Sequence, residues 1–229
     1  MTMQLPHTLE DWNSAEFVNA WLERSVRTLD VRKQRYLLMG ALLGFAPDAA
    51  FRFVDVGGGG GWLIATLLDA YPNSTAVWLD MSAPMEAAAR QTLAGHGDRV
   101  TYVRADLSVP GWSAALRAER LQAAVSTIAI HNLFDPAAIR GVYRDLAAVL
   151  DPGAVFVDND YTAGHPSLLP QYRSAAAHRR GDRAGTGVGG GGHFAGTLAD
   201  HLQWLHDAGF SAVDCAWREL NLSILLAKK

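Results

Sequence analysis

Five consecutive glycines, Gly57 to Gly61, constrain the fold of this 229-residue chain more than any other feature. An apolar, strand-like segment at 51–56 precedes them, and a helix-like segment at 62–68 follows. Because glycine has no Cβ, such a turn lets backbone N–H groups approach a ligand beside a helix N-terminus. The pattern therefore predicts a ligand site between a strand and a helix. A flexible linker is the alternative, but linkers join domains and lack such flanking segments.

The spacing of the glycines distinguishes between classes of ligand. The dinucleotide fingerprint G-x-G-x-x-G needs a third glycine where every register of this run has a large apolar residue. A phosphate loop needs Lys followed by Ser or Thr, and no such pair follows the run. The pattern present is an acidic residue followed by alternating glycines, namely Asp55, Gly57, Gly59 and Gly61.

This motif resembles the first motif of the class I S-adenosylmethionine-dependent methyltransferases. In that family the glycines pack under the methionine part of the cofactor. The turn at 150–154, Leu-Asp-Pro-Gly-Ala, is similar to the family's L-x-P-G-G turn, with Ala154 in place of the second glycine. The resemblance covers roughly 51–160 and 196–229, and it implies S-adenosyl-L-methionine as the cofactor.

Strand-like and helix-like segments alternate from residue 51 onward, which favours a parallel sheet with helices on both faces. The last two strands, 212–217 and 221–227, are joined by a short link and predict an antiparallel pair. We therefore expect a doubly wound, mostly parallel, seven-stranded α/β sheet of the Rossmann-like methyltransferase type. The earlier strands are expected at 51–56, 75–80, 100–105, 121–126 and 154–157.

Two further segments are expected to flank the sheet within a single domain, 1–229. Residues 8–46 have helical character and predict an N-terminal helical cap, which either packs on the sheet edge or covers the cofactor. Residues 161–195 follow the fifth strand and include a second glycine-rich stretch. A long irregular insertion at this edge of the sheet is often functional, so we interpret it as a lid over the substrate.

The composition favours a compact enzyme without a strongly charged face. The formal net charge is -3, which does not predict nucleic acid as a partner. One cysteine, Cys215, excludes an internal disulfide and a cysteine-based zinc site. The sequence shows no secretory signal and no apolar stretch of about 18 residues, so we expect a cytoplasmic protein without a membrane span. A homodimer is left open.

Carboxylates at the ends of the first three strands predict the cofactor contacts. Asp80 is placed to accept hydrogen bonds from ribose hydroxyls, although a helix cap is the alternative. The resemblance implies that Asp106 accepts from the adenine amino group, with a turn carboxylate as the alternative. It also implies that Asp55 supports the glycine loop near the cofactor's amino group. The predicted cofactor-binding residues are Asp55, Gly57, Gly59, Gly61, Asp80, Met81, Asp106, Leu107 and Ser126.

The segment after the fourth strand carries the main catalytic candidate. Ser126 to Leu133 resembles the S-x-x-x-H-H-L segment of small-molecule methyltransferases, with Asn132 in place of the second histidine. His131 could act as a base when the acceptor carries a proton, or it could serve structurally. Tyr161 is a second catalytic candidate, at the end of the fifth strand. The Asp158-Asn159 pair resembles the end of the fifth strand in metal-dependent catechol-type O-methyltransferases. The acid that follows the fourth strand in those enzymes is missing here, since Ser126 and Thr127 stand in its place, so no metal is expected.

We therefore expect an enzyme that transfers a methyl group from S-adenosylmethionine to O, N or C of a small metabolite. Three alternatives stay open. They are other chemistry on the same fold, a noncatalytic binding protein, and an RNA-modifying methyltransferase with a basic surface around Arg173, Arg179, Arg180 and Arg183.

Overall fold

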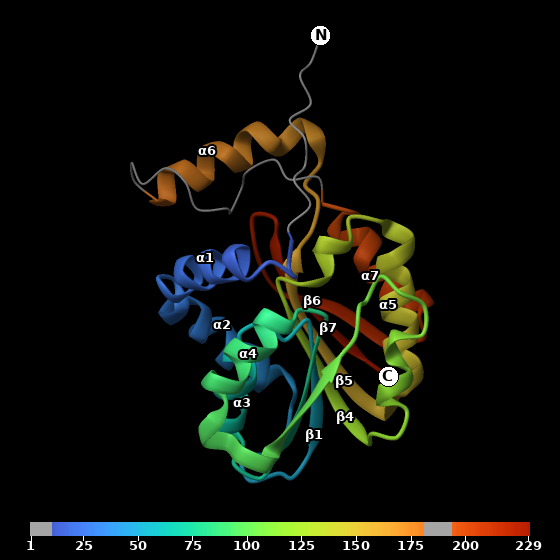
Figure 1. Ribbon diagram of the computed structural model, residues 1–229. Coiled ribbons are helices and arrows are strands. Elements are labelled where there is room, and N and C mark those ends of the chain that lie inside the picture. The colour runs from blue at the N-terminus through green and yellow to red at the C-terminus, as the bar shows by residue number, and fades with distance from the viewer. Residues whose placement is uncertain (1–10, 181–193) are drawn as a thin grey trace.

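A computed structural model describes residues 11–180 and 194–229 as a seven-stranded sheet between two helical layers (Figure 1). The strand order is β3-β2-β1-β4-β5-β7-β6. Only β7 runs against its neighbours, β5 and β6, so the predicted antiparallel pair and mostly parallel sheet are confirmed. The strands are β1 Arg52–Val56, β2 Thr75–Asp80, β3 Val100–Arg104, β4 Leu121–Thr127, β5 Leu150–Tyr161, β6 Ala212–Glu219 and β7 Leu222–Lys228.

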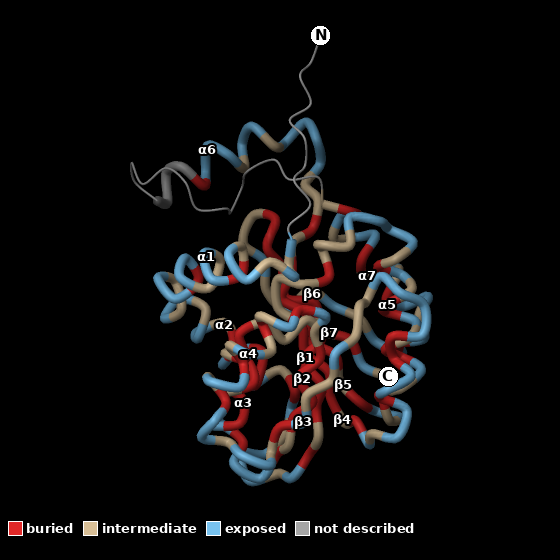
Figure 2. The backbone as a smooth tube through the Cα atoms, in the orientation of Figure 1, coloured by how far each residue is buried: buried red, intermediate tan, exposed pale blue. Residues whose placement is uncertain are grey.

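Helices cover both faces of the sheet and enclose two apolar cores. Helices α1 to α4 lie on one side, and α5 and α7 lie on the other (Figure 1). Because successive strand residues point to opposite faces, Phe53 belongs to the core under α2 and α3, while Val54 belongs to the core under α5. Figure 2 shows buried backbone concentrated in the strands. The helices are α1 Ala15–Val26, α2 Leu29–Leu42, α3 Trp62–Ala70, α4 Ala83–Thr92, α5 Pro136–Val149, α6 Leu169–Arg180 and α7 Leu198–Asp207.

The strand order reverses at β1, which pairs with β2 on one side and with β4 on the other. Connections leave this point toward opposite faces of the sheet, and ligands bind at such a switch point in open α/β folds. The glycine turn follows β1 directly, and a short 3₁₀ helix, η3 (Ile130–Leu133), follows β4. The topology therefore brings the glycines and the His131 segment to the same edge.

Side-chain caps fix where several helices begin. The Ser82 hydroxyl accepts a hydrogen bond from the backbone N–H of Met85 at 3.1 Å, as expected for an N-cap, and Pro84 lies in the first turn of α4. Thr197 and Asp200 form a reciprocal capping box at the start of α7. These caps orient α4 and α7 against the sheet.

Apart from shifts of one or two residues at strand ends, the structure differs from the sequence-based element bounds in three places. β5 is longer than 154–157, because the strand pairs with β7 up to Tyr161. The helix expected at 112–120 is the short 3₁₀ helix η2, Trp112–Leu116. The 161–195 insertion contains η4 (Pro166–Leu168) and α6, whose alanines favour a helix. Helix α6 projects beyond the sheet (Figure 1), and the glycine-rich part of the insertion, 181–193, lies outside the described residues.

The remaining short element is η1, Ala94–Arg99. Across residues 11–180 and 194–229, every helix is too short or too polar to cross a membrane.

We predict that Thr197→Ala lowers the free energy of unfolding by about 1 kcal/mol, because the Ala side chain cannot accept from the Asp200 N–H. Thr197→Ser keeps the hydroxyl and is the matched control. Chemical denaturation measures both variants. Equal stability of wild type and Thr197→Ala would show that the capping box does not stabilise the N-terminus of α7.

Candidate active site

The glycine loop is packed so closely that side chains are excluded from most of it. Gly57, Gly59 and Gly61 have φ values of +74°, +46° and +81°, which L-residues with a side chain rarely adopt. A Cβ on Gly57 would lie 2.3 Å from Ala129 Cβ. A Cβ on Gly58 would lie 2.5 Å from Trp78 Cδ1, so this glycine, outside the alternating motif, is also constrained by packing.

A cavity of about 310 Å³ opens above this loop, at the small end of the roughly 300–1,000 Å³ typical of small-molecule sites. Its walls come from the glycine loop, from the ends of β2, β3 and β4, and from α1 and α2. The lining residues are Trp12, Trp21, Arg32, Tyr36, Gly57 to Gly61, Trp62, Leu63, Asp80, Met81, Met85, Ala105, Asp106, Leu107, Ser108, Thr127, Ile128, Ala129, Asn132, Leu133 and Phe134.

Asp80 ties the glycine loop to the start of α4. Its Oδ2 accepts from the Gly59 N–H at 3.0 Å, and its Oδ1 accepts from the Ser82 N–H at 2.9 Å. Burial raises the pKa of Asp80, while these backbone hydrogen bonds oppose the rise. Next to it, Met81 lines the cavity with 37% of its surface exposed. Asp80 is thus rigidly held at the cavity wall.

Asp106 and Leu107 line the cavity just after β3. Asp106 Oδ1 accepts from the backbone N–H of Ser108 at 2.8 Å and from its hydroxyl at 2.7 Å. These hydrogen bonds show that Asp106 is a turn carboxylate, as the alternative interpretation expected. Asp106 also lies on the cavity wall, where its carboxylate could accept from an adenine amino group.

Asp55 lies beneath the loop and is completely buried. Neither of its carboxylate oxygens has a hydrogen-bond partner within the described part of the chain. Burial, reinforced by the negative charge of Asp80, raises the pKa of Asp55 to about 8. Asp55 is not among the cavity-lining residues of the described chain. A buried carboxyl without a partner is costly, and a cationic group close to Asp55 would stabilise its charged form.

Ser126, like Asp55, is a predicted cofactor residue that lies below the loop instead of on the cavity wall. It is fully buried, and its hydroxyl donates to the Val56 carbonyl at 2.9 Å. Ser126 is not among the cavity-lining residues of the described chain. Its hydroxyl joins the ends of β4 and β1 below the loop.

His131 forms a dyad with Asp160, a pairing that the sequence analysis had not predicted. Its Nδ1 lies 2.5 Å from Asp160 Oδ1, and its backbone N–H donates to Asp160 Oδ2 at 2.9 Å. Burial alone would raise the pKa of Asp160, but the charge and hydrogen bonds of His131 hold it below the usual value. The dyad therefore places an ionised carboxylate against the imidazole.

Two aromatic rings surround this dyad. The Tyr161 ring meets His131 edge to face at 5.2 Å and stacks on Phe194 at 5.0 Å. Cavity-lining residues follow His131 directly in the chain, beginning with Asn132. The two predicted catalytic residues, His131 and Tyr161, are therefore in contact with each other, and neither is among the cavity-lining residues of the described chain.

A second buried carboxyl on β5 belongs to a separate polar network. The Tyr143 hydroxyl lies 3.5 Å from Asp158 Oδ2 and 2.8 Å from His201 Nδ1. His201 Nε2 lies 2.8 Å from the Ala195 carbonyl. Burial raises the pKa of Asp158 well above its usual value, and the neighbouring charge of Asp160 adds to the rise. This network fixes α7 and Ala195 behind the His131 dyad.

The residues of the Asp158-Asn159 pair point to different partners. Asn159 donates from Nδ2 to Thr127 Oγ1 at 3.0 Å, on the cavity side. Among the described residues, no cluster of three or more His, Cys, Asp or Glu side chains is arranged to hold a metal ion.

The sequence analysis left open whether the N-terminal helices cover the cofactor, and it did not identify Arg32 and Tyr36 as residues of the cavity wall. Arg32 and Tyr36 line the cavity from α2, and Trp12 and Trp21 line it from the segment around α1. The Ser82 hydroxyl donates to the Trp12 carbonyl at 2.5 Å, which joins this segment to α4. Arg32 and Tyr36 are four residues apart, on one helix face, and that spacing was the available signal.

Comparison with known proteins agrees with this geometry. Residues 53–153, from β1 to the turn in β5, match a family described as the methyltransferase domain. No match was found among curated proteins.

Solved structures of methyltransferases share the fold over most of this chain. An O-methyltransferase family protein from Burkholderia thailandensis has a TM-score of 0.65 and 19% identity, over 93% of this chain and 58% of its own. An O-methyltransferase family 2 protein from Planctomyces limnophilus, in complex with apigenin, has a TM-score of 0.65 and 15% identity, over 98% and 63%. PigF with SAH has a TM-score of 0.63 and 16% identity, over 95% and 60%. The chain thus spans about three fifths of the length of these proteins.

We predict that wild-type protein without ligand loses stability as the pH rises from 5 to 8, whereas Asp55→Asn loses less. The pKa of Asp55 is raised to about 8 in the folded state. The contribution of Asp55 to the free energy of unfolding is therefore complete below the pKa of Asp55 in the unfolded chain, near 4. It declines by about 1.4 kcal/mol per pH unit up to the pKa of Asp55 in the folded protein. Thermal melting at several pH values measures this. If the melting temperatures of wild type and Asp55→Asn fall in parallel as the pH rises, the pKa of Asp55 is not raised in the folded protein.

Proposed function

We propose that this chain is a class I S-adenosylmethionine-dependent methyltransferase that transfers a methyl group to O, N or C of a small metabolite. The observation that carries this proposal is the glycine loop after β1, which lines a ligand-sized cavity and is packed too closely to accept most side chains. The buried Asp55 lies beneath this loop. The family match over 53–153 covers this loop.

The residues around the cavity fit S-adenosylmethionine, which when bound supplies an activated methyl group. The glycine loop would lie under its methionine part, with Asp55 facing the ammonium group. Asp80, beside Met81, would accept from the ribose hydroxyls, because a carboxylate oxygen can accept more than one hydrogen bond. Asp106 would accept from the adenine amino group.

His131 is proposed as the base for acceptors that carry a proton. Asp160 at 2.5 Å favours the tautomer with hydrogen on Nδ1, and the acceptor's proton would then be taken at Nε2. The adjacent carboxylate would stabilise the imidazolium that results. Tyr161 is proposed to position the acceptor, since its ring contacts the His131 ring. Acceptors without an acidic proton need alignment only.

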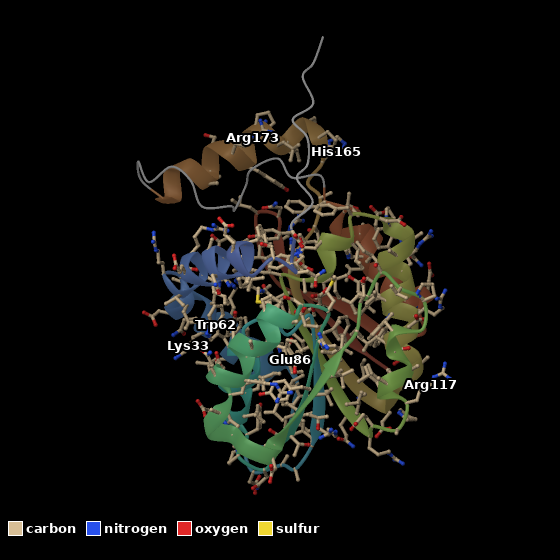
Figure 3. The ribbon with its side chains drawn as sticks, in the orientation of Figure 1. Lys33, Trp62, Glu86, Arg117, His165 and Arg173 are labelled. Carbon is tan, nitrogen blue, oxygen red and sulfur yellow. The ribbon has the colours of Figure 1, made fainter. Side chains whose placement is uncertain are left out.

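The comparisons favour a small-molecule acceptor over the other functions considered. The apigenin complex and a mitomycin 7-O-methyltransferase are both among the structures of similar fold. For the RNA alternative, Arg173 is exposed on α6 (Figure 3), but Arg183 lies outside the described residues. A cytoplasmic location, a homodimer and a lid role for 161–195 stay predictions.

We predict that wild-type protein binds S-adenosylmethionine and that Asp80→Ala and Asp106→Ala weaken binding at least about tenfold, because each removes hydrogen bonds to a charged acceptor. Asp98→Ala, an exposed acid in η1, is the control and should bind normally. Isothermal titration calorimetry measures the affinities. Unchanged affinity in Asp80→Ala would overturn the ribose contact.

We predict that His131→Ala lowers turnover by about 10² to 10⁴, the usual contribution of a general base, and leaves cofactor affinity within about twofold. Asp160→Asn should shift the pH dependence of turnover, since it removes the charge beside Nδ1. The assay measures S-adenosylhomocysteine formation with an acceptor identified by screening small metabolites. Full turnover in His131→Ala would assign His131 a structural role.

A further inference from the structure

An arginine on α2 faces the cavity and has no part in the function proposed so far. Arg32 lines the same cavity as the glycine loop. In the described part of the chain, none of the salt bridges involves Arg32. A guanidinium at a cavity wall without an acidic partner can bind an anionic group of a ligand, and its planar fork matches a carboxylate.

Aromatic packing fixes Arg32 in relation to the glycine loop. Its guanidinium carbon lies 5.5 Å from the centroid of the Trp21 ring, within the range of a cation–π contact. Trp21 in turn stacks on Trp62, with 6.2 Å between centroids and 16° between planes. Trp62 is the first residue of α3 and follows Gly61 directly, and Figure 3 labels it beside the N-terminal helices. The arginine and the loop are therefore parts of one packed unit.

Tyr36 links this positive group to the buried acid below the loop. It lines the cavity one helical turn after Arg32 and is 3% exposed. Burial raises the pKa of the Tyr36 hydroxyl, the nearby Arg32 lowers it, and the charge of Asp55 raises it. A cation and an acid therefore both act on the Tyr36 hydroxyl, and an α-amino acid carries the complementary pair of charges.

We propose that Arg32 binds the α-carboxylate of the cofactor's methionine part, with the Tyr36 hydroxyl beside it and Asp55 facing the α-ammonium group. The inference rests on the proposed function, because it requires S-adenosylmethionine in the glycine-lined cavity. It makes Arg32 the residue that selects cofactors with a carboxylate. Arg32 lies outside the matched segment 53–153, so the N-terminal helices complete the cofactor site.

The experiment compares two ligands that differ only in this carboxylate. Calorimetry measures binding of S-adenosylmethionine and of decarboxylated S-adenosylmethionine to wild type, Arg32→Met, Arg32→Lys and Lys33→Met. Lys33 is exposed on the same helix (Figure 3), so Lys33→Met removes the same charge without altering the cavity. Melting temperatures check that each variant is folded.

We expect Arg32→Met to weaken S-adenosylmethionine binding about 10- to 100-fold, as for a lost charge-assisted hydrogen-bonded pair. Its affinity for the decarboxylated ligand should not fall. The affinity of Arg32→Lys for S-adenosylmethionine should lie between those of wild type and Arg32→Met, and the affinity of Lys33→Met should match that of wild type. Binding of the decarboxylated ligand also confirms that Arg32→Met keeps an intact cavity.

Equal weakening of both ligands, or no weakening of either, would overturn the inference while leaving the proposed function in place. Unchanged cofactor affinity together with a raised KM for the acceptor would assign Arg32 to an anionic group of the acceptor instead. If wild-type protein binds neither ligand, the proposed function and this inference both fail.

Discussion

The approach of Gly57 to Ala129 sets the arrangement of this site. Its missing Cβ would lie 2.3 Å from the alanine Cβ, so the turns after β1 and β4 touch at the point where the strand order reverses. Any side chain at Gly57 would separate these turns. The cavity, the start of α3 and the His131 segment all depend on that contact, because each begins at one of the two turns. The glycine run is therefore a packing requirement as much as a ligand-binding device.

The buried carboxyls around this contact differ in how they are stabilised. Asp80 and Asp160 accept backbone hydrogen bonds, and Asp160 also faces His131. Asp55 has no such partner among the described residues and carries a raised pKa. Polar groups left unsatisfied in a core are costly and concentrate at functional sites. The unsatisfied carboxyl of Asp55 therefore supports the proposed contact with a cationic group, and the hydrogen-bonded pair of His131 and Asp160 supports the proposed role of His131 as a base.

The sequence predicted the sheet and the cofactor edge because both are local signals. Strand periodicity, the alternating glycines and the acids after each strand are read within a few residues of one another, and the structure places Asp80 and Asp106 on the cavity wall. Contacts between distant segments were not predictable in this way. The pairing of His131 with Asp160 depends on how η3 returns to β5, and the position of Arg32 depends on how α2 packs on α3. Helix α6 was missed because the glycine-rich stretch after it suggested a loop throughout.

A crystal structure with S-adenosylhomocysteine would show whether the cofactor lies between the glycine loop and α2. We expect ligand density in the cavity, with the amino acid part over Gly57 to Gly61 and its carboxylate against Arg32. The adenine should lie beside Met81 and Asp106. Density for the ligand at another site, or an amino acid part directed away from α2, would show that this placement of the cofactor is wrong.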